Sequence, residues 1–196
     1  ILIIIQCILS YQGNSQSSNF KNFNTEQGLP QSQVLSILQD HYGNMWFGTN
    51  GGGVGKYNGN KFVSLNDYDG LISNIIYSII EIKTNSLLFA TDKGLSVYDG
   101  ISFKNYSEKE GLKNPLIFKL LLDNEKIWIG TQEGVYILKD EKIAPFLDNK
   151  ILNNSSVYTI YKDFNHNLWF GTLQNGVIFY DVKNKVFRNF TIENGL

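Results

Sequence analysis

One four-residue motif returns along the chain at an almost constant spacing. Successive copies begin 42, 40 and 41 residues apart. The motif reads WFGT at 46–49, LFAT at 88–91, WIGT at 128–131 and WFGT at 169–172. A period of roughly 20–50 residues indicates a repeat architecture, in which each unit buries its apolar surface against its neighbours. This spacing constrains the possible folds more than any other feature.

Other residues recur in phase with this motif. Gly-Leu stands at 28–29, 70–71, 111–112 and 195–196, and Lys150-Ile151 takes its place before the fourth repeat. A tyrosine follows each motif, at Tyr57, Tyr98, Tyr136 and Tyr180. A phenylalanine comes next, at Phe62, Phe103 and Phe187, with Ile143 or Phe146 in the third repeat. The chain therefore contains four repeats in register.

Each repeat has the pattern of short strands. In the first repeat we predict strands over Val34–Gln39, Met45–Thr49, Gly53–Tyr57 and Lys61–Leu65. The intervening turns are rich in Gly, Asn and Asp, and Asn58-Gly59 has the composition that β-hairpins favour. Strands such as WFGT are apolar on both faces, which indicates burial on both faces. No stretch after the first fifteen residues shows a convincing helical period.

Four-stranded units that must bury both faces are typical of the β-propeller, where they stack radially as blades. We therefore predict an all-β fold with four blades, at about 34–66, 75–106, 116–147 and 157–191. The stretch FKNF at 20–23 matches FRNF at 187–190, which lies in the fourth strand of the last repeat. We expect an outer strand over 20–24 that completes a further blade and hides a sheet edge. A closed ring of four blades is the alternative, and it leaves that strand without a blade.

The first residues predict export. The segment ILIIIQCILS is apolar and is followed by polar residues, with Gly13 and Ser15 at the positions that a signal peptidase selects. We assign residues 1–15 to the remnant of a signal peptide and 16–196 to the propeller; a buried first strand is the alternative. The only cysteine, Cys7, lies in this segment, so we expect no disulfides in the mature chain. Gln6 before it disfavours a lipid anchor.

The stretch GLPQSQVLSILQDHYGNMWFGTNGGGVGKYNG resembles the two-component regulator propeller repeat. The resemblance covers about Phe20 to Leu196; the second repeat departs from it with Leu88 and Ala90, and the third lacks the turn glycine. It implies the sensor region of a periplasmic, membrane-anchored hybrid histidine kinase, within a propeller of about seven blades. It also implies that the ligand is an oligosaccharide and that kinase activity belongs to the parent protein.

Catalysis finds little support in the sequence. His41 and His166 lie in corresponding turns and read as solvated turn residues, without the spacing of a zinc site. Asp40, Asp123 and Asp163 end first strands and are expected to cap the turns that follow. The glycines at 51–53 precede a strand and lack the Gly-Lys-Ser/Thr ending of a phosphate loop. We expect no catalytic residue, metal or cofactor.

Binding is the better-supported function. In a propeller, the fourth-to-first and second-to-third connections surround one mouth of the central channel. They carry polar residues, many of them amides that can donate and accept hydrogen bonds as a polyhydroxyl ligand requires. The candidate ligand-binding residues are Gln31, Gln33, Asn50, Asn74, Asp92, Lys93, Asn114, Gln132, Glu133, Asn154, Gln174 and Asn175.

The partners expected are a small glycan or other polar ligand and the remaining blades and signalling domains of the parent; a homodimer stays open. With 17 Lys and Arg against 18 Asp and Glu, nothing favours nucleic acid. Two other functions compete with the sensor. A propeller lyase would need a histidine and an acid at the channel mouth, and a secreted binding or scaffold propeller would need neither.

Overall fold

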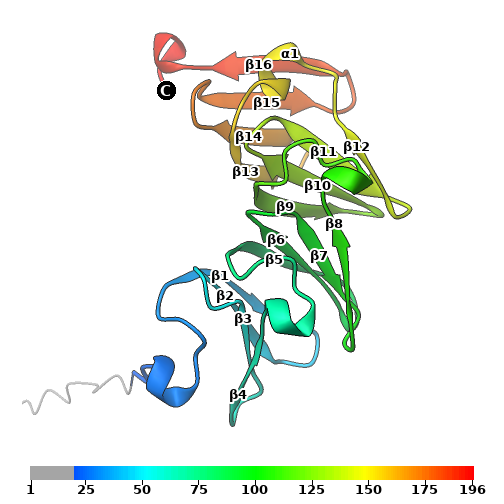
Figure 1. The fold of residues 1–196 in the computed structure, drawn as a ribbon. Coiled ribbons are helices and arrows are strands. Elements are labelled where there is room, and N and C mark those ends of the chain that lie inside the picture. Colours follow the sequence, from blue (N-terminus) through cyan, green and yellow to red (C-terminus); the bar gives the residue numbers. More distant parts are fainter. Residues whose placement is uncertain (1–19) are drawn as a thin grey trace, which may run out of the picture.

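The structure is a computed structural model that describes residues 20–196 as four antiparallel, four-stranded sheets (Figure 1). The first sheet contains β1 (Val34–Gln39), β2 (Met45–Thr49), β3 (Val54–Tyr57) and β4 (Phe62–Leu65). The second contains β5 (Ile76–Lys83), β6 (Ser86–Thr91), β7 (Leu95–Tyr98) and β8 (Phe103–Tyr106). The third contains β9 (Ile117–Asp123), β10 (Lys126–Thr131), β11 (Val135–Lys139) and β12 (Lys142–Pro145). The fourth contains β13 (Val157–Lys162), β14 (Leu168–Thr172), β15 (Val177–Asp181) and β16 (Val186–Phe190).

The all-β propeller prediction is confirmed. Every sheet is a simple meander whose strands pair in chain order, and we call the sheets blades 1 to 4. The strands β1 and β2 have the predicted bounds, whereas β3 and β4 each begin one residue later than predicted. The first strands β1, β5, β9 and β13 contact one another in sequence, so they form the inner edge of the row of blades (Figure 1). The signal peptide predicted at 1–15 lies outside the described residues.

Adjacent blades pack face to face through the residue at the start of the repeated motif. Trp46 of blade 1 contacts Phe89 of blade 2, with ring centroids 6.0 Å apart. Trp128 of blade 3 contacts Phe170 of blade 4 at 6.1 Å. Leu88 takes the same place between blades 2 and 3, in a cluster with Ile129. One apolar cluster therefore fills each of the three interfaces between the described blades.

A hydrogen bond from each indole fixes the turn between first and second strands. Trp46 Nε1 donates to Asp40 Oδ2 at 2.8 Å, and the same carboxylate accepts the backbone N–H groups of Tyr42 and Asn44. Trp128 donates to Asp123 at 3.2 Å, and Trp169 to Asp163 at 3.0 Å. Asp40 and Asp163 thus cap turns, as predicted, whereas Asp123 accepts hydrogen bonds from the side chains of Asn124, Trp128 and Lys162. All three aspartates orient the tryptophans of the repeat. In blade 2 the aspartate is replaced by Ile82 and the tryptophan by Leu88, so the donor and the acceptor of this hydrogen bond are both missing.

The repeated threonine shapes the connection between second and third strands. Its hydroxyl donates to a glycine carbonyl further along the chain, for instance from Thr49 to Gly53 at 2.8 Å and from Thr172 to Gly176 at 2.9 Å. Gly53 has a φ of 77°, and a Cβ there would lie 2.3 Å from the Leu65 carbonyl oxygen. Glycine is required at this position because both the backbone angle and the lack of space exclude a side chain.

The Gly-Leu pairs end a short 3₁₀ turn after the fourth strand. In the turn Asp67–Asp69, Asn66 caps the start and Gly70 takes a left-handed conformation at the end. The leucine that follows is buried between blades, as Leu71 and Leu112 show. Before blade 4 the helical turn α1 (Lys150–Asn153) takes the place of the 3₁₀ turn. There Leu152 is the buried leucine, so the alignment of Lys150-Ile151 with Gly-Leu is wrong by one residue.

Residues 20–24 form no strand here, and the described residues contain no free third strand of the further blade that the predicted outer strand would complete, so that strand stays a prediction. Residues 20–24 run without regular structure into the 3₁₀ turn Thr25–Gln27, and Phe23 packs beside Tyr57 and Phe62 of blade 1. A fourth strand needs a third strand to pair with, and each described third strand already pairs with its own fourth strand. The likeness of the two stretches extends to the turns that follow them, because Asn24 and Thr191 both start a capping box that ends in Gly-Leu.

Replacing Trp128 with alanine should lower the free energy of unfolding by about 3–5 kcal/mol, as expected for a fully buried aromatic residue. Trp128 is 1% exposed between two blades. Trp169→Ala is the matched control, because this residue has the same place in the repeat but is only half-buried. Urea denaturation followed by circular dichroism measures both. Equal losses for the two variants would contradict the assignment of these interfaces.

Acid should weaken the fold through the aspartates that accept the indole hydrogen bonds. Burial alone would raise the pKa of Asp123, but hydrogen bonds from Lys162 and Trp128 outweigh it and hold that pKa below its ordinary value. Because the folded pKa is the lower one, the stabilisation is complete above the unfolded pKa of about 4 and is lost as the pH falls through the folded value. We expect Asp123→Asn to reduce the loss of unfolding free energy between about pH 6 and about pH 3. Glu125→Gln, in the same turn, is the control and should leave that loss unchanged.

Candidate functional site

The fourth-to-first and second-to-third connections come together at one end of the blades, as the meander topology requires. Backbone hydrogen bonds join connections of neighbouring blades. Gly51 and Gly53 of blade 1 both donate to the Asn74 carbonyl at 2.9 Å, and Gly134 donates to Ser155 at 2.8 Å. This end, which we call the loop face, carries all the candidate ligand-binding residues.

Several of the candidate side chains hold the loops in place. Asn50 Nδ2 donates to Gln33 Oε1 at 2.9 Å, and Asp92 accepts a short hydrogen bond from Ser73. Asn74 Oδ1 accepts the backbone N–H of Asp67 at 3.0 Å. These contacts use part of the hydrogen-bonding capacity that the sequence offered for a ligand.

The remaining candidates differ in what they contact. Gln174 and Asn175 of blade 4 are linked to the serines of their own fourth-to-first connection; Asn175 Nδ2 donates to Ser155 Oγ at 2.7 Å. Gln31 accepts from the backbone of Ser32, and Asn114 from that of Leu116. The exposed candidates are Gln33, Lys93, Gln132, Glu133, Asn154 and Gln174.

An aromatic row at the inner edge was missed by sequence reasoning. Tyr77, Phe118 and Tyr158 are the second residues of β5, β9 and β13, directly after the fourth-to-first connections. The Phe118 and Tyr158 rings are stacked with centroids 4.1 Å apart, and Tyr77 meets Phe118 edge-on at 5.6 Å. Burial, followed by the nearby Asp92 and Tyr158, raises the pKa of Tyr77. All three aromatic residues stand at the same position of the repeat, and this common position was the sequence signal that could have identified them.

The histidines lie away from this face. His41 and His166 occupy turns between first and second strands, at the opposite end of the blades from the loop face. The His41 backbone N–H donates to Glu81 of blade 2 at 2.8 Å, which ties two blades together. Residues 20–196 contain no group of His, Cys, Asp or Glu arranged to hold a metal ion. None of the helices in that same range has the length and apolar character needed to cross a membrane.

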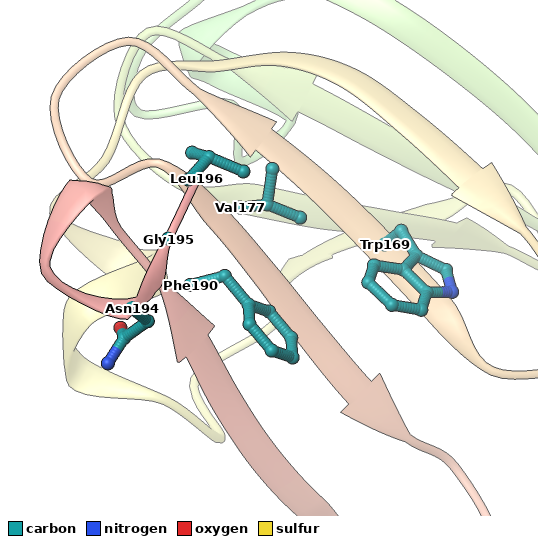
Figure 2. A pocket seen from close by; sticks show the side chains of 6 residues that line it. All are labelled: Trp169, Val177, Phe190, Asn194, Gly195 and Leu196. Atoms are coloured by element: carbon teal, nitrogen blue, oxygen red, sulfur yellow. The ribbon is translucent and has the colours of Figure 1, made fainter.

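A pocket of about 400 Å³ lies on the face of blade 4 that is turned away from blade 3 (Figure 2). Trp169, Val177 and Phe190 project into it from β14, β15 and β16, and Leu196 lies beside Val177. The corresponding residues of blade 1, Trp46 and Val54, are buried against blade 2. The pocket is therefore the half of a blade interface that no described blade covers.

A second pocket, of about 330 Å³, opens on the loop face of blade 3. Glu133 and Asn154 are the only candidate residues that line it, and they come from different connections. The structure therefore places all the sequence candidates on one face but brings only these two to a common pocket within residues 20–196.

The comparisons with known proteins agree with this architecture. The family model described as two component regulator propeller matches residues 28–51 and 151–174. Histidine kinase P4 of Formosa agariphila is 32% identical over 190 residues, a match that covers 92% of this chain and 11% of that protein. This chain thus spans about a tenth of the length of that relative.

Solved structures show the same fold. The extracellular domain of the two component system protein BT4673 from B. thetaiotaomicron superposes with a TM-score of 0.72 at 24% identity, over 88% of this chain and 23% of that one. The WD40 β-propeller domain of Doa1 superposes with a TM-score of 0.60 at 15% identity, over 81% of this chain and 53% of that one. The chain is thus a run of four β-propeller blades that carries two component regulator propeller repeats and is homologous to a histidine kinase.

Proposed function

We propose that this chain is the extracytoplasmic, ligand-sensing propeller region of a hybrid histidine kinase. The observation that carries the proposal is the 32% identity to Histidine kinase P4, which extends over 92% of the chain. The likeness of fold to an extracellular domain of a two component system protein supports the extracytoplasmic placement. Kinase chemistry then belongs to other parts of the parent protein, and these blades contribute recognition.

The exposed faces of the end blades support a larger propeller, for which the family resemblance implies about seven blades. Ile37 of blade 1 is 61% exposed, whereas the corresponding Ile79 and Ile160 are 6% and 3% exposed inside blade interfaces. Trp169 of blade 4 is likewise less buried than Trp46. Both end faces therefore expose side chains of the kind that are buried inside the blade interfaces, and further blades of the parent would cover them.

The loop face supports a neutral oligosaccharide as the ligand. Its exposed side chains include amides, positively charged groups and negatively charged groups. Such groups can donate hydrogen bonds to sugar hydroxyls and accept hydrogen bonds from them. Aromatic side chains at the inner edge, among them Tyr77 and Tyr158, add apolar surface beside polar groups such as Asp92. Sites of this kind, mostly apolar with a few placed polar groups, are typical of small-ligand recognition.

Isothermal titration calorimetry of the chain with maltohexaose, cellohexaose, laminarihexaose, xylohexaose and mannohexaose tests the ligand class. We expect at least one of these neutral sugars to bind with a Kd below about 1 mM, which corresponds to roughly −4 kcal/mol. Hexagalacturonate is the anionic control and should bind more weakly. Failure of all five neutral sugars to bind, or preference for the anionic one, would contradict a neutral oligosaccharide ligand.

Fusions after Leu196, expressed from the gene's own start codon, test the location. Alkaline phosphatase needs disulfides that form outside the cytoplasm, so its fusion should be active in bacterial cells. A β-galactosidase fusion at the same residue is the control and should have low activity. The reverse pattern would place the propeller in the cytoplasm and remove the sensor proposal.

A further inference from the structure

The pocket on blade 3 exists because one connection departs from the others. In blade 2 the residue after the buried leucine is Ile72, which packs beside Gly94. If Gly94 carried a Cβ, that atom would lie 3.0 Å from Ile72 Cδ1. In blade 1 the same place holds Pro30, whose Cδ would lie 2.7 Å from a Cβ on Gly55, two residues further along in β3. An apolar side chain thus fills the space beside the second-to-third connection in blade 2 and beside the start of the third strand in blade 1.

Blade 3 has Lys113 at this place, and the lysine is exposed at the surface. The atoms closest to a Cβ on Gly134 are backbone atoms of Asn153, not side-chain atoms of Lys113. The space that Ile72 fills in blade 2 is therefore open in blade 3. It forms the pocket of about 330 Å³.

The floor of this pocket is aromatic. Tyr136 and Phe146 line it and are 5% and 9% exposed. Tyr136 stands where blade 2 has Ser96, and its hydroxyl lies beside the backbone N–H groups of Lys113 and Asn114. Burial raises the pKa of Tyr136 in spite of these two N–H groups, so the hydroxyl keeps its proton at neutral pH.

The rim of the pocket is polar. Lys113 and Glu133 contribute one charge of each sign, and neither forms an ion pair within residues 20–196. Asn153 and Asn154 come from the end of α1 and the residue after it, where this helical turn replaces the usual 3₁₀ turn. Asn154 Nδ2 donates to the Lys150 carbonyl at 3.1 Å, which fixes the orientation of its amide.

This combination selects a particular ligand chemistry. A volume near the lower end of the range for ligand pockets suits a single ring rather than a whole oligosaccharide. An aromatic floor with a hydroxylic and amide rim matches a pyranose, which has apolar C–H faces and hydroxyls around its edge. An anionic sugar would gain from Lys113 but would be repelled by Glu133, so a neutral ring fits best.

We propose that the blade 3 pocket binds the terminal sugar ring of a neutral oligosaccharide. This inference rests on the proposed function, which assigns that ligand class to the loop face. It adds the place and the orientation of binding, because one end of the sugar chain lies in the pocket and the rest extends over the loops.

Two substitutions of one residue give the sharpest test. Lys113→Ile should fill the pocket as Ile72 does in blade 2, and we expect the neutral hexasaccharide that binds wild type most tightly to bind at least about tenfold more weakly. Lys113→Ala removes the same charge but leaves the pocket open, so we expect it to weaken binding at least about threefold less than Lys113→Ile does. Thermal unfolding by circular dichroism checks that both variants fold.

A second pair compares the two ends of blade 3. Glu133→Ala changes the rim of the pocket and should weaken binding, whereas Glu125→Ala, in the turn between β9 and β10 at the opposite end of the blade, should not. Calorimetry with the five neutral hexasaccharides is the measurement for all four variants.

The possible results separate the two proposals. Loss of affinity in Lys113→Ile and Glu133→Ala, with a smaller loss in Lys113→Ala and unchanged affinity in Glu125→Ala, supports both. Unchanged binding in all four folded variants overturns the pocket assignment and leaves the oligosaccharide-sensing proposal standing. If none of the neutral sugars binds wild type, both proposals are overturned.

Discussion

The contact between the second strand of one blade and the face of the next is the interaction on which this fold depends. Each blade has apolar side chains on both faces, and four short strands cannot bury both without a neighbour. Trp46 and Trp128 are the largest fully buried side chains of the described blades, and a hydrogen bond to Asp40 or Asp123 holds each ring in position. The turn and the interface are therefore stabilised by the same aspartate.

The fold could be predicted because its determinants repeat. The spacing of the WFGT motif fixed the unit, and glycine and asparagine marked the turns, so the bounds of β1 and β2 were correct. The outer strand expected over 20–24 stays a prediction, because no third strand in the described residues is free to pair with it. A strand is defined by its partner, and the resemblance to residues 187–190 carries no information about that partner.

The candidate site was predictable only in part. Topology placed the polar residues of the connections on one face, but which side chains are engaged with each other depends on distances that the sequence does not contain, as for Asn50 with Gln33. The blade 3 pocket follows from a missing apolar side chain at Lys113. It becomes visible in the sequence only when this position is compared in register with Ile72 and Pro30, which requires the buried leucines as anchors.

The uniform construction of the interfaces has an evolutionary consequence. The half-interface on blade 4, with Trp169 and Val177, has the same residue types as the one on blade 1, with Trp46 and Val54. An in-frame duplication or loss of one repeat in the gene would join two surfaces that already match each other. Blade number can then change in a single recombination event, while a substitution such as the one at Lys113 can diversify one blade without disturbing the rest.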